Sequence, residues 1–375
     1  MRKQRVILVI IFFIILGAAG SALALRYKWN KPLGPALELP TLTSSPNSIV
    51  AVSDIHPTEP GQNSDSLATA TQSADIQPAS TSGPKPAPTS HPLCGAPSSM
   101  IILLIGSDQR GTSYLYGLAD SIHIVRVDFT KPDLMVIDFP RDLWVEIPGI
   151  SDHHGITHGK LNQAYLYGNP GMGYYDGPGE GPGLMARTLE LNFGLRVDHY
   201  LALDTDTFVK MIDAVGGVDI TVDSPIDLSY DVTDPGPEYF LSVGTHHLDG
   251  ERTLILATNR IPSTFQRMKY QKIILSALRD QLLTRDMIPK LPKLVAQFID
   301  SVQTDLSPRD INNLICIAEA IPSANIQADS FPQAMFKASN TYDPYRNVYT
   351  FIYETDFNEI RRMVTDFMNG IWPFQ

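Results

Sequence analysis

The chain is poor in cysteine and lacks the short motifs that mark several common enzyme folds. Its 375 residues include only two cysteines, Cys94 and Cys316, too few for a disulfide-rich scaffold or an all-cysteine zinc site. No Gly-x-Ser-x-Gly, His-Glu-x-x-His or P-loop pattern occurs, so the corresponding hydrolases and nucleotidases have no support. No internal repeat is present either, which leaves a solenoid or a propeller without support.

Basic residues are in the minority. Lysine and arginine together number 29 against 40 aspartates and glutamates, and the formal net charge is -11. A chain this acidic has no general electrostatic attraction to nucleic acid, and we expect no nucleic-acid partner. Basic residues that serve the function must therefore be concentrated at one place.

One long hydrophobic run stands near the N-terminus. Residues 6–25 carry no charge and are long enough to span a bilayer as a helix. Three basic residues within positions 1–5 favour a cytoplasmic tail there. We therefore expect a single-pass signal anchor in the cell membrane, with the remaining chain on the extracellular side. A signal peptide cleaved after the small residues at 22–24 is the alternative.

The rest of the chain divides by composition. Residues 26–93 are rich in Pro, Ser, Thr and Ala and predict a disordered spacer. Residues 94–280 mix short apolar runs with amphipathic segments, which predicts a three-layer α/β/α domain around a central mixed β-sheet. Residues 281–375 are expected to form a helical extension packed on that core. In an exported domain the two cysteines favour a disulfide bond, and two unpaired thiols are the alternative.

Charged side chains stand at the ends of three predicted strands. Asp108 and Arg110 follow the first strand, Asp120 precedes the second, and Arg141 follows the third. Loops at one edge of an α/β sheet tend to meet in a single crevice. Carboxylates suit Mg²⁺ and arginine forks suit phosphate oxygens, so the pattern favours a magnesium-bound diphosphate. A plain surface loop and a local ion pair between Arg141 and Asp142 are the alternatives.

The order of several longer motifs resembles the LytR–CpsA–Psr (LCP) family. The stretches "ILLIGSDQR", "ADS", "FPRDLWVEIPG", "KLNQAY", "FVKMIDAVGGVDITV" and "FQRMKYQ" follow one another within residues 99–280, nearly half the chain. The resemblance implies a membrane-anchored enzyme on the outer face of the cell. Such enzymes transfer a phosphoglycosyl unit from a polyprenyl-diphosphate-linked glycan to a cell-wall acceptor with the help of Mg²⁺. It also implies an apolar tunnel under the sheet for the lipid tail.

The resemblance also implies roles for individual residues. Asp108 and Asp120 would hold the metal, and together with Arg141 they are the catalytic candidates. The diphosphate-binding candidates are Arg110, Arg141, Arg260, Arg267 and Gln271. The expected tunnel walls are Leu184, Met185, Phe208, Met211 and Ile212. These five lie on predicted helices that must cover the sheet.

The chain departs from the family pattern at four positions. Leu118 and Thr258 stand where the family has arginine, Thr264 replaces an aspartate, and Tyr270 replaces another arginine. Loss of one preorganised donor can cost about 10²–10³ in rate. The leading hypothesis is a Mg-dependent phosphotransferase of the glycopolymer–cell wall ligase type. The alternative is a catalytically weakened module that binds polyprenyl-phosphate lipid or wall glycan. Export and negative charge disfavour a third reading, a transcriptional attenuator.

Two glycine-rich stretches offer weaker candidates. His153, His154 and His158 could bind zinc, but a loop setting without an i, i+4 pair disfavours this. Residues 167–183 could cradle an anion at the start of the following helix. We favour instead a rim whose tyrosines stack on sugar rings.

Overall fold

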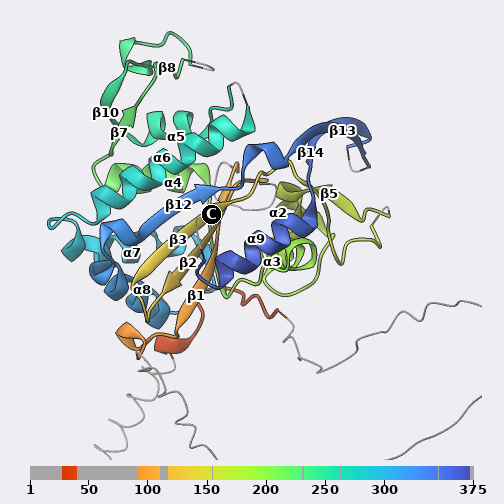
Figure 1. Ribbon diagram of the computed structural model, residues 1–375, viewed down its shortest axis with the longest axis horizontal. Helices are drawn as coiled ribbons and strands as arrows, with labels where there is room; N and C mark the ends of the chain where they lie inside the picture. Colours follow the sequence, from red (N-terminus) through yellow and green to blue (C-terminus); the bar gives the residue numbers. More distant parts are fainter. Residues whose placement is uncertain are drawn as a thin grey trace, which may run out of the picture. The chain divides into compact units, whose positions relative to one another are not determined.

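Figure 1 shows the computed structural model of the protein. The structure describes residues 28–39, 91–109, 117–153, 155–229, 232–261, 263–344 and 346–371. The expected cytoplasmic tail, the apolar run 6–25, most of the spacer and Arg110 lie outside these residues. Within the described ranges, no helix has the length and apolar character needed to cross a membrane.

A mixed β-sheet forms the centre of the fold. Its strands follow the order β11-β6-β1-β2-β3-β12. Their bounds are β1 (Ser99–Ser107), β2 (Ala119–Asp128), β3 (Asp133–Asp138), β6 (His199–Leu203), β11 (Gln303–Thr304) and β12 (Ile326–Ser330). The chain-consecutive strands β1, β2 and β3 pair antiparallel, whereas β6 pairs with β1 and β12 with β3 in parallel. The predicted mixed sheet is thus confirmed.

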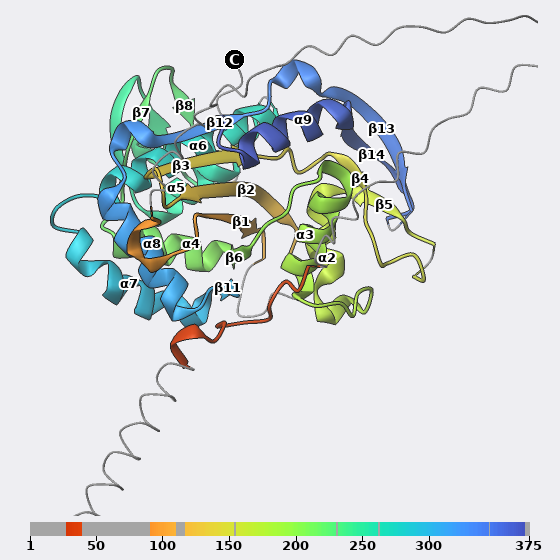
Figure 2. The same cartoon turned by 60° about the horizontal axis from the view of Figure 1, so that its bottom comes forward.

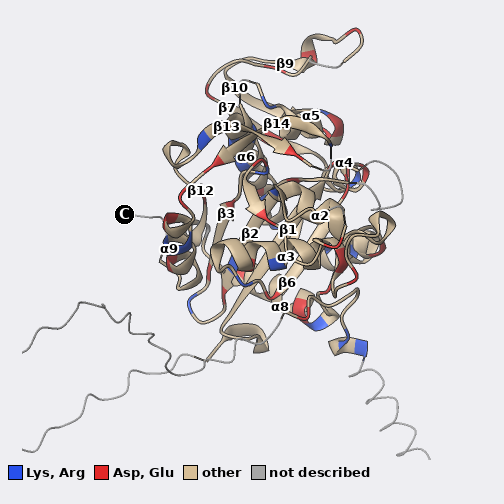
Figure 3. Ribbon diagram, turned by 90° about the vertical axis from the view of Figure 1, so that its right-hand side faces the viewer, with Lys and Arg blue, Asp and Glu red and all other residues tan. Residues whose placement is uncertain are grey.

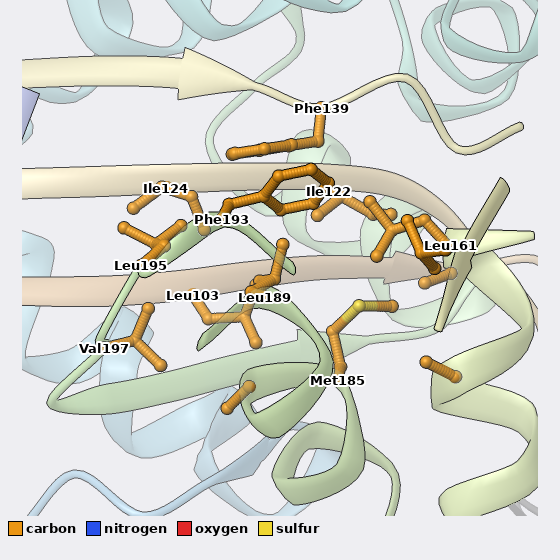
Figure 4. Close-up of a cluster of buried hydrophobic side chains, with 14 of the residues drawn as sticks. Leu103, Ile122, Ile124, Phe139, Leu161, Met185, Leu189, Phe193, Leu195 and Val197 are labelled. Atoms are coloured by element: carbon orange, nitrogen blue, oxygen red, sulfur yellow. The ribbon is translucent and has the colours of Figure 1, made fainter. Parts of the chain in front are cut away.

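Helices cover both faces of this sheet, as Figure 1 shows. One face packs against α2 (Leu161–Gly168), α3 (Glu180–Phe193) and α9 (Phe357–Met368). Figure 4 shows this core, where Leu103, Ile122 and Ile124 of the strands meet Leu189 and Phe193 of α3. Because side chains alternate along a strand, the neighbouring residues face the other layer. That layer is formed by α6 (Thr264–Leu282) and α8 (Pro308–Ala320).

A smaller lobe lies at the end of the molecule drawn at the top of Figure 1. It contains α4 (Thr205–Ala214), α5 (Gly250–Thr258), β7 (Val218–Val222), β8 (Ile226–Asp227), β9 (Phe240–Leu241) and β10 (Gly244–Leu248). Its apolar cluster includes Ile212, Ile220 and Tyr270, so α6 belongs to both this lobe and the main layer. α4 is capped by Asp204, whose carboxylate accepts the Thr207 N–H at 2.7 Å.

The C-terminal region differs from the helical extension that we expected. It does contain α7 (Leu291–Phe298), α8 and α9, but it also supplies β11 and β12 to the central sheet. The strands β13 (Lys337–Asp343) and β14 (Val348–Glu354) form a further hairpin. Another small pair, β4 (Trp144–Glu146) and β5 (His158–Lys160), precedes α2. Residues 281–375 are therefore part of the same α/β domain.

Part of the expected spacer also belongs to the domain. Leu37 is 3% exposed, the Tyr200 hydroxyl donates to the Pro35 carbonyl at 2.9 Å, and the Leu33 N–H donates to the Leu306 carbonyl. Residues 28–39 therefore lie along the domain, in contrast to the prediction of a spacer from residue 26 onward. Cys94 and Cys316 form a disulfide bond, with 6.0 Å between their Cα atoms, which ties the start of the domain to α8.

Candidate functional site

Three loops and the start of a helix bring charged side chains together at one edge of the sheet. β1 ends at Ser107 and β2 begins at Ala119, and these two residues are paired. Asp108 and Asp120 therefore emerge next to each other. The Asp108 carboxylate accepts the Leu118 N–H at 2.7 Å, and the Asp108 N–H donates to the Leu118 carbonyl at 3.1 Å. These bonds hold Asp108 beside Leu118, two residues before Asp120.

Asp120 lies between two arginines. Arg141, which follows β3, donates to its Oδ1 through Nη1. Arg267 of α6 reaches its Oδ2 at 3.5 Å. α6 is positioned by its cap, because the Ser263 hydroxyl accepts the Gln266 N–H at 3.3 Å. The Asp120 carboxylate thus links the start of β2 to helix α6.

A second carboxylate, Asp142, supports the first. Its Oδ1 accepts from Lys160 Nζ at 3.1 Å, and its Oδ2 accepts from the Thr264 hydroxyl at 3.1 Å. Arg141 Nε lies 3.5 Å from Asp142 Oδ2. Arg141 therefore contacts both carboxylates, so the expected local ion pair and the predicted site coexist. Lys160 and Thr264 are members of this network that we did not predict.

Burial and neighbouring charges perturb these groups. Burial, with the nearby Arg141 charge, lowers the pKa of Arg267 to about 10. Burial alone would raise the pKa of Asp142, but Arg141 and Lys160 outweigh it and hold that pKa below its ordinary value. Burial, with the charge of Asp120 beside it, raises the pKa of Asp108. The site therefore holds two arginines close together although their charges repel.

The charged cluster opens into an apolar interior. A cavity of about 180 Å³ has Asp108 and Asp120 at its polar side and Phe208, Leu254 and Ile274 among its apolar walls. A second cavity, of about 820 Å³, lies between the sheet and helices α6 and α8. Its walls include Ile102, Val125, Val136, Leu278, Leu282 and Ile317. Leu104 and Leu275 line both cavities, so the two are contiguous.

The tunnel residues that we expected divide into two groups. Phe208 lines the smaller cavity. Leu184 and Met185 are fully buried in the core on the opposite face of the sheet, and Ile212 is buried in the lobe. Met211 is half-buried and lines neither cavity. The walls come instead from alternate positions of β1, β2 and β3 together with α6 and α8, which the choice of helices α3 and α4 missed.

The remaining phosphate candidates also differ in position. Gln271 lines the smaller cavity, with its Nε2 donating to the Ala257 carbonyl at 3.1 Å. Arg260 is exposed, and its charge contributes to the lowered pKa of Arg267, so it lies nearby. In the view of Figure 3 the basic residues are interspersed with acidic ones, without one basic face among the described residues.

The smaller cavity has one polar pair that the sequence analysis did not single out. Ser121 and His123 of β2 line it, and the Ser121 hydroxyl lies 2.6 Å from His123 Nε2. Burial lowers the pKa of His123 to about 4, so the imidazole is neutral at neutral pH. The alternation of "ADSIHIV" is the signal that could have placed both side chains on the cavity face.

Comparison with known proteins settles the family. The model of the LytR_cpsA_psr family matches residues 64–363. The chain belongs to the LytR_cpsA_psr family.

Individual relatives match about half of the chain. The chain is 29% identical over 211 residues to the regulatory protein MsrR of Staphylococcus aureus (strain COL), covering 55% of this chain and 56% of MsrR. It is 30% identical over 208 residues to a transferase, TagV of Bacillus subtilis (strain 168), covering 55% of this chain and 49% of TagV. The chain thus spans about half the length of these relatives. The crystal structure of B. subtilis TagV superposes with a TM-score of 0.55 at 25% identity, covering 72% of this chain and 98% of that structure.

The four departures from the LytR_cpsA_psr pattern do not all fall at the site. Tyr270 is 8% exposed and lies in the apolar cluster of the lobe. Thr264, where the resemblance implies an aspartate, donates through its hydroxyl to the buried Asp142 carboxylate. Thr258 lines the smaller cavity, and Leu118 is held against Asp108 through its backbone. Of the positions where the resemblance implies an arginine, only Leu118 and Thr258 therefore lie beside Asp108 or the smaller cavity, and we call this part of the site the mouth.

Side chains of the glycine-rich stretches make ring contacts among the described residues. No group of three His, Cys, Asp or Glu side chains there could hold a metal ion. His153 packs against Tyr174 at 4.9 Å, and Tyr174 packs against Tyr167 at 5.2 Å, while His154 lies outside the described residues. Tyr167 and Tyr174 thus pack against each other, and stacking of the rim tyrosines on sugar rings stays a prediction.

Proposed function

We propose that this protein transfers a phosphoglycosyl unit from a polyprenyl-diphosphate-linked glycan to an acceptor of the cell wall or envelope. The observation that carries the proposal is the junction of the charged cluster around Asp120 with the contiguous apolar cavities. A polyprenyl diphosphate has the same division, with a doubly charged head on a long hydrocarbon tail. TagV, a polyisoprenyl-teichoic acid–peptidoglycan teichoic acid transferase by name, supports the same class of reaction.

The tail would lie in the larger cavity. The walls between the sheet and helices α6 and α8 are aliphatic at most positions, and charged side chains such as Lys272 and Arg279 stand on α6. Burying apolar surface contributes about 25 cal/mol per Å², so a hydrocarbon chain gains affinity along the whole cavity. Leu104 and Leu275 line both cavities, so the head and the tail of one lipid would meet beside these two residues.

The diphosphate would be bound by the arginines. Arg141 and Arg267 already face one carboxylate and lie close together, an arrangement that an anion relieves because it offers both guanidinium groups a new partner. Arg110, Arg260 and Gln271 are further candidates from their positions in the family motifs. Each charge-assisted hydrogen bond would contribute roughly 1.5–3 kcal/mol.

Asp108 and Asp120 would hold Mg²⁺. The fit rests on two neighbouring carboxylates at the mouth of one cavity, since magnesium takes one or two carboxylates and fills its other positions with phosphate oxygens and water. When bound, the ion neutralises charge that develops on the phosphate oxygens. The chain's own part is to orient Asp120 through Arg141 and Arg267, and to orient Asp108 through the backbone of Leu118.

The proposed reaction is a phosphoryl-group displacement. An acceptor hydroxyl forms a new P–O bond to the phosphorus that carries the glycan, and the anhydride bond between the two phosphates breaks. The electron pair of that bond leaves with polyprenyl monophosphate, and the hydroxyl proton passes to solvent. Arg141 and Arg267 would stabilise the charge that moves between the two phosphates.

We further propose that residues 6–25 anchor the protein in the cell membrane and that the domain lies outside. The uncharged run and the basic residues before it support this topology. Protease added to wall-stripped cells should cleave within residues 40–90 and release the domain. Complete protection of the chain, or a mature N-terminus near Leu25, would contradict the anchor.

A non-catalytic lipid- or glycan-binding module is the second candidate. The specific observation in its favour is that Leu118 and Thr258 stand beside the mouth without a charged side chain. Restoring arginine at both positions tests it. A gain of transfer in the double variant together with an inactive wild type would favour the module.

Binding of the lipid tests the site itself. Calorimetry with a polyprenyl diphosphate should show affinity in the wild type and a loss of about tenfold or more in Arg141→Ala, because one charge-assisted partner is removed. Arg126→Ala is a matched control. Arg126 is also a buried arginine, but it lies on strand β2 and contacts Asp128 rather than Asp120. Equal affinity in Arg141→Ala and wild type would reject the phosphate role.

A further inference from the structure

The hairpin β13–β14 has one aromatic side. Its register pairs Tyr342 with Tyr349, Asn340 with Phe351 and Ala338 with Tyr353. Paired residues of antiparallel strands share a face, and alternate pairs share the same one. We call Asn340, Tyr342, Tyr349, Phe351 and Tyr353 the aromatic face. The opposite side of the hairpin carries Ile352, which is 1% exposed and packs inward.

Most of the aromatic face is open to solvent. Tyr349 is 78% exposed, Tyr342 45% and Phe351 41%. Their rings are supported by neighbours, since Tyr342 and Tyr349 lie 5.7 Å apart and Phe351 lies 5.0 Å from Tyr353. Large aromatic side chains that are exposed together on one face are typical of a binding surface. Tyrosines suit this role because they give a large contact area at a low entropy cost.

The aromatic face continues into the charged site. The Tyr353 N–H donates to the Asp142 carbonyl at 2.9 Å. The Tyr353 ring also lies 5.1 Å from Phe265, which follows Thr264 on the first turn of α6. Asp142, Thr264 and Arg267 belong to the cluster around Asp120. A long ligand lying on the hairpin would therefore reach the mouth of the lipid cavity.

The chemistry of the face favours a glycan strand. A pyranose ring presents C–H groups to an aromatic ring, whose face is electron-rich, and hydroxyls around its rim. Successive same-face residues of β14 are about 7 Å apart, so a chain of sugar rings along the strand would meet several aromatic rings. The Asn340 amide and the tyrosine hydroxyls could bind hydroxyls and N-acetyl groups at the rim.

A membrane surface fits less well. Residues 337–354 contain Lys337, Arg346, Asp343 and Glu354, a balanced set without the basic cluster that anionic lipid attracts. Figure 1 also draws the hairpin at the upper right of the domain and residues 28–39, in red, at its lower edge. The segment that follows the proposed anchor is thus at the other end of the domain from the aromatic face.

We propose that the aromatic face is the acceptor subsite, which holds the sugar rings of a wall glycan strand and directs one of its hydroxyls toward the mouth. This inference rests on the proposed function, because an acceptor has meaning only if the site transfers. It identifies the acceptor as a glycan chain recognised by stacking, and it assigns the hairpin a role that the lipid site does not need.

The test compares glycan binding by the full-length protein and its variants in detergent. The probes are N-acetylglucosamine oligomers and uncross-linked glycan strands released from purified peptidoglycan. The double variant Tyr349→Ala, Phe351→Ala should bind both at least tenfold more weakly. Phe240→Ala, which removes a 53% exposed phenylalanine from β9, should bind as the wild type does. Tyr349→Trp should retain affinity, because it keeps a stacking surface.

The outcomes separate this inference from the proposed function. If the double variant binds glycan and polyprenyl diphosphate as the wild type does, the acceptor subsite is overturned and the lipid site is unaffected. A wild type that binds glycan through the face but not the lipid supports the subsite and contradicts the proposed function. The acceptor subsite is also overturned if the wild type binds no glycan and the double variant loses vesicle binding or self-association. Loss of vesicle binding would assign the aromatic face to a membrane, and loss of self-association would assign it to a second copy of the chain. Thermal unfolding of each variant shows that the domain is folded.

Discussion

Replacing Arg267 by methionine should make the folded domain more stable while it weakens the site. The Arg267 side chain is only 4% exposed, and its Nε has no hydrogen-bond partner among the described residues. Burial and the charge of Arg141 lower its pKa to about 10. At about 1.36 kcal/mol per pKa unit, this corresponds to a cost of about 3 kcal/mol for a charged Arg267 in the folded state.

The sign of this effect follows from linkage. A cation with a lowered pKa in the folded protein destabilises it at every pH below that pKa, so the full penalty is present at pH 7. Arg267→Met removes the penalty and leaves Asp120 paired with Arg141. We expect a gain on the order of 1–3 kcal/mol, and about 2–4 °C in Tm per kcal/mol for a domain of this size. Affinity for polyprenyl diphosphate should fall roughly 10–150-fold.

Differential scanning fluorimetry and calorimetry of binding check both effects. Arg126→Met is the matched control, because Arg126 is also buried and pairs with Asp128 at 3.1 Å and Asp133 at 3.7 Å. Its loss leaves two partly buried carboxylates unpaired and should lower Tm. If Arg267→Met lowers Tm by several degrees, as Arg126→Met should, then charged Arg267 stabilises the fold. That result would refute the claim that Arg267 costs stability and serves to bind the diphosphate.

Three further predictions concern stability. Burial raises the pKa of Asp138 to about 7, whereas this carboxyl ionises near pH 4 in the unfolded chain. The stability of the folded domain should therefore fall as pH rises from about 4 to 7. Asp138→Asn should raise Tm at pH 8 and flatten that decline, and an unchanged Tm at pH 8 would contradict this. The disulfide closes a loop with a sequence separation of 222, so Cys94→Ser should cost about 5 kcal/mol in the chain-entropy model, whereas two freely alkylated thiols in native protein would disprove the bond. Tyr270→Arg restores a residue of the family pattern but places a charge in the apolar lobe, so it should lower Tm without improving diphosphate affinity; tighter binding would show that position 270 faces the site.

The sheet and the acidic mouth could be predicted from local patterns. The apolar run before Asp108 and the alternation around Ile122 specify adjacent strands whose ends meet, and the arginines follow from motif order. The partners of Asp142 could not be predicted, because Lys160 and Thr264 come from different elements that only tertiary packing brings together. A side chain's neighbours across layers depend on the helix positions, which local periodicity does not fix.

Four of the five expected tunnel residues line neither cavity, for the same reason. Leu184 and Met185 have the apolar spacing of any sheet-covering helix, and the sequence gives no sign of which face that helix covers. The strands β11 and β12 were missed because each is short and gains its partners only in the sheet. Short strands without a hairpin partner carry little local signal.

The central claim is transfer of a glycan phosphate from lipid to acceptor, and one assay measures it directly. The full-length protein is incubated with Mg²⁺, a polyprenyl-diphosphate-linked oligosaccharide labelled in the sugar, and purified peptidoglycan. We predict that labelled sugar becomes attached to the acceptor through one phosphate while polyprenyl monophosphate is released in equal amount, and that Asp120→Ala and Arg141→Ala lose both products. Donor that binds to the wild type but yields no polyprenyl monophosphate with any acceptor or divalent ion would contradict the claim.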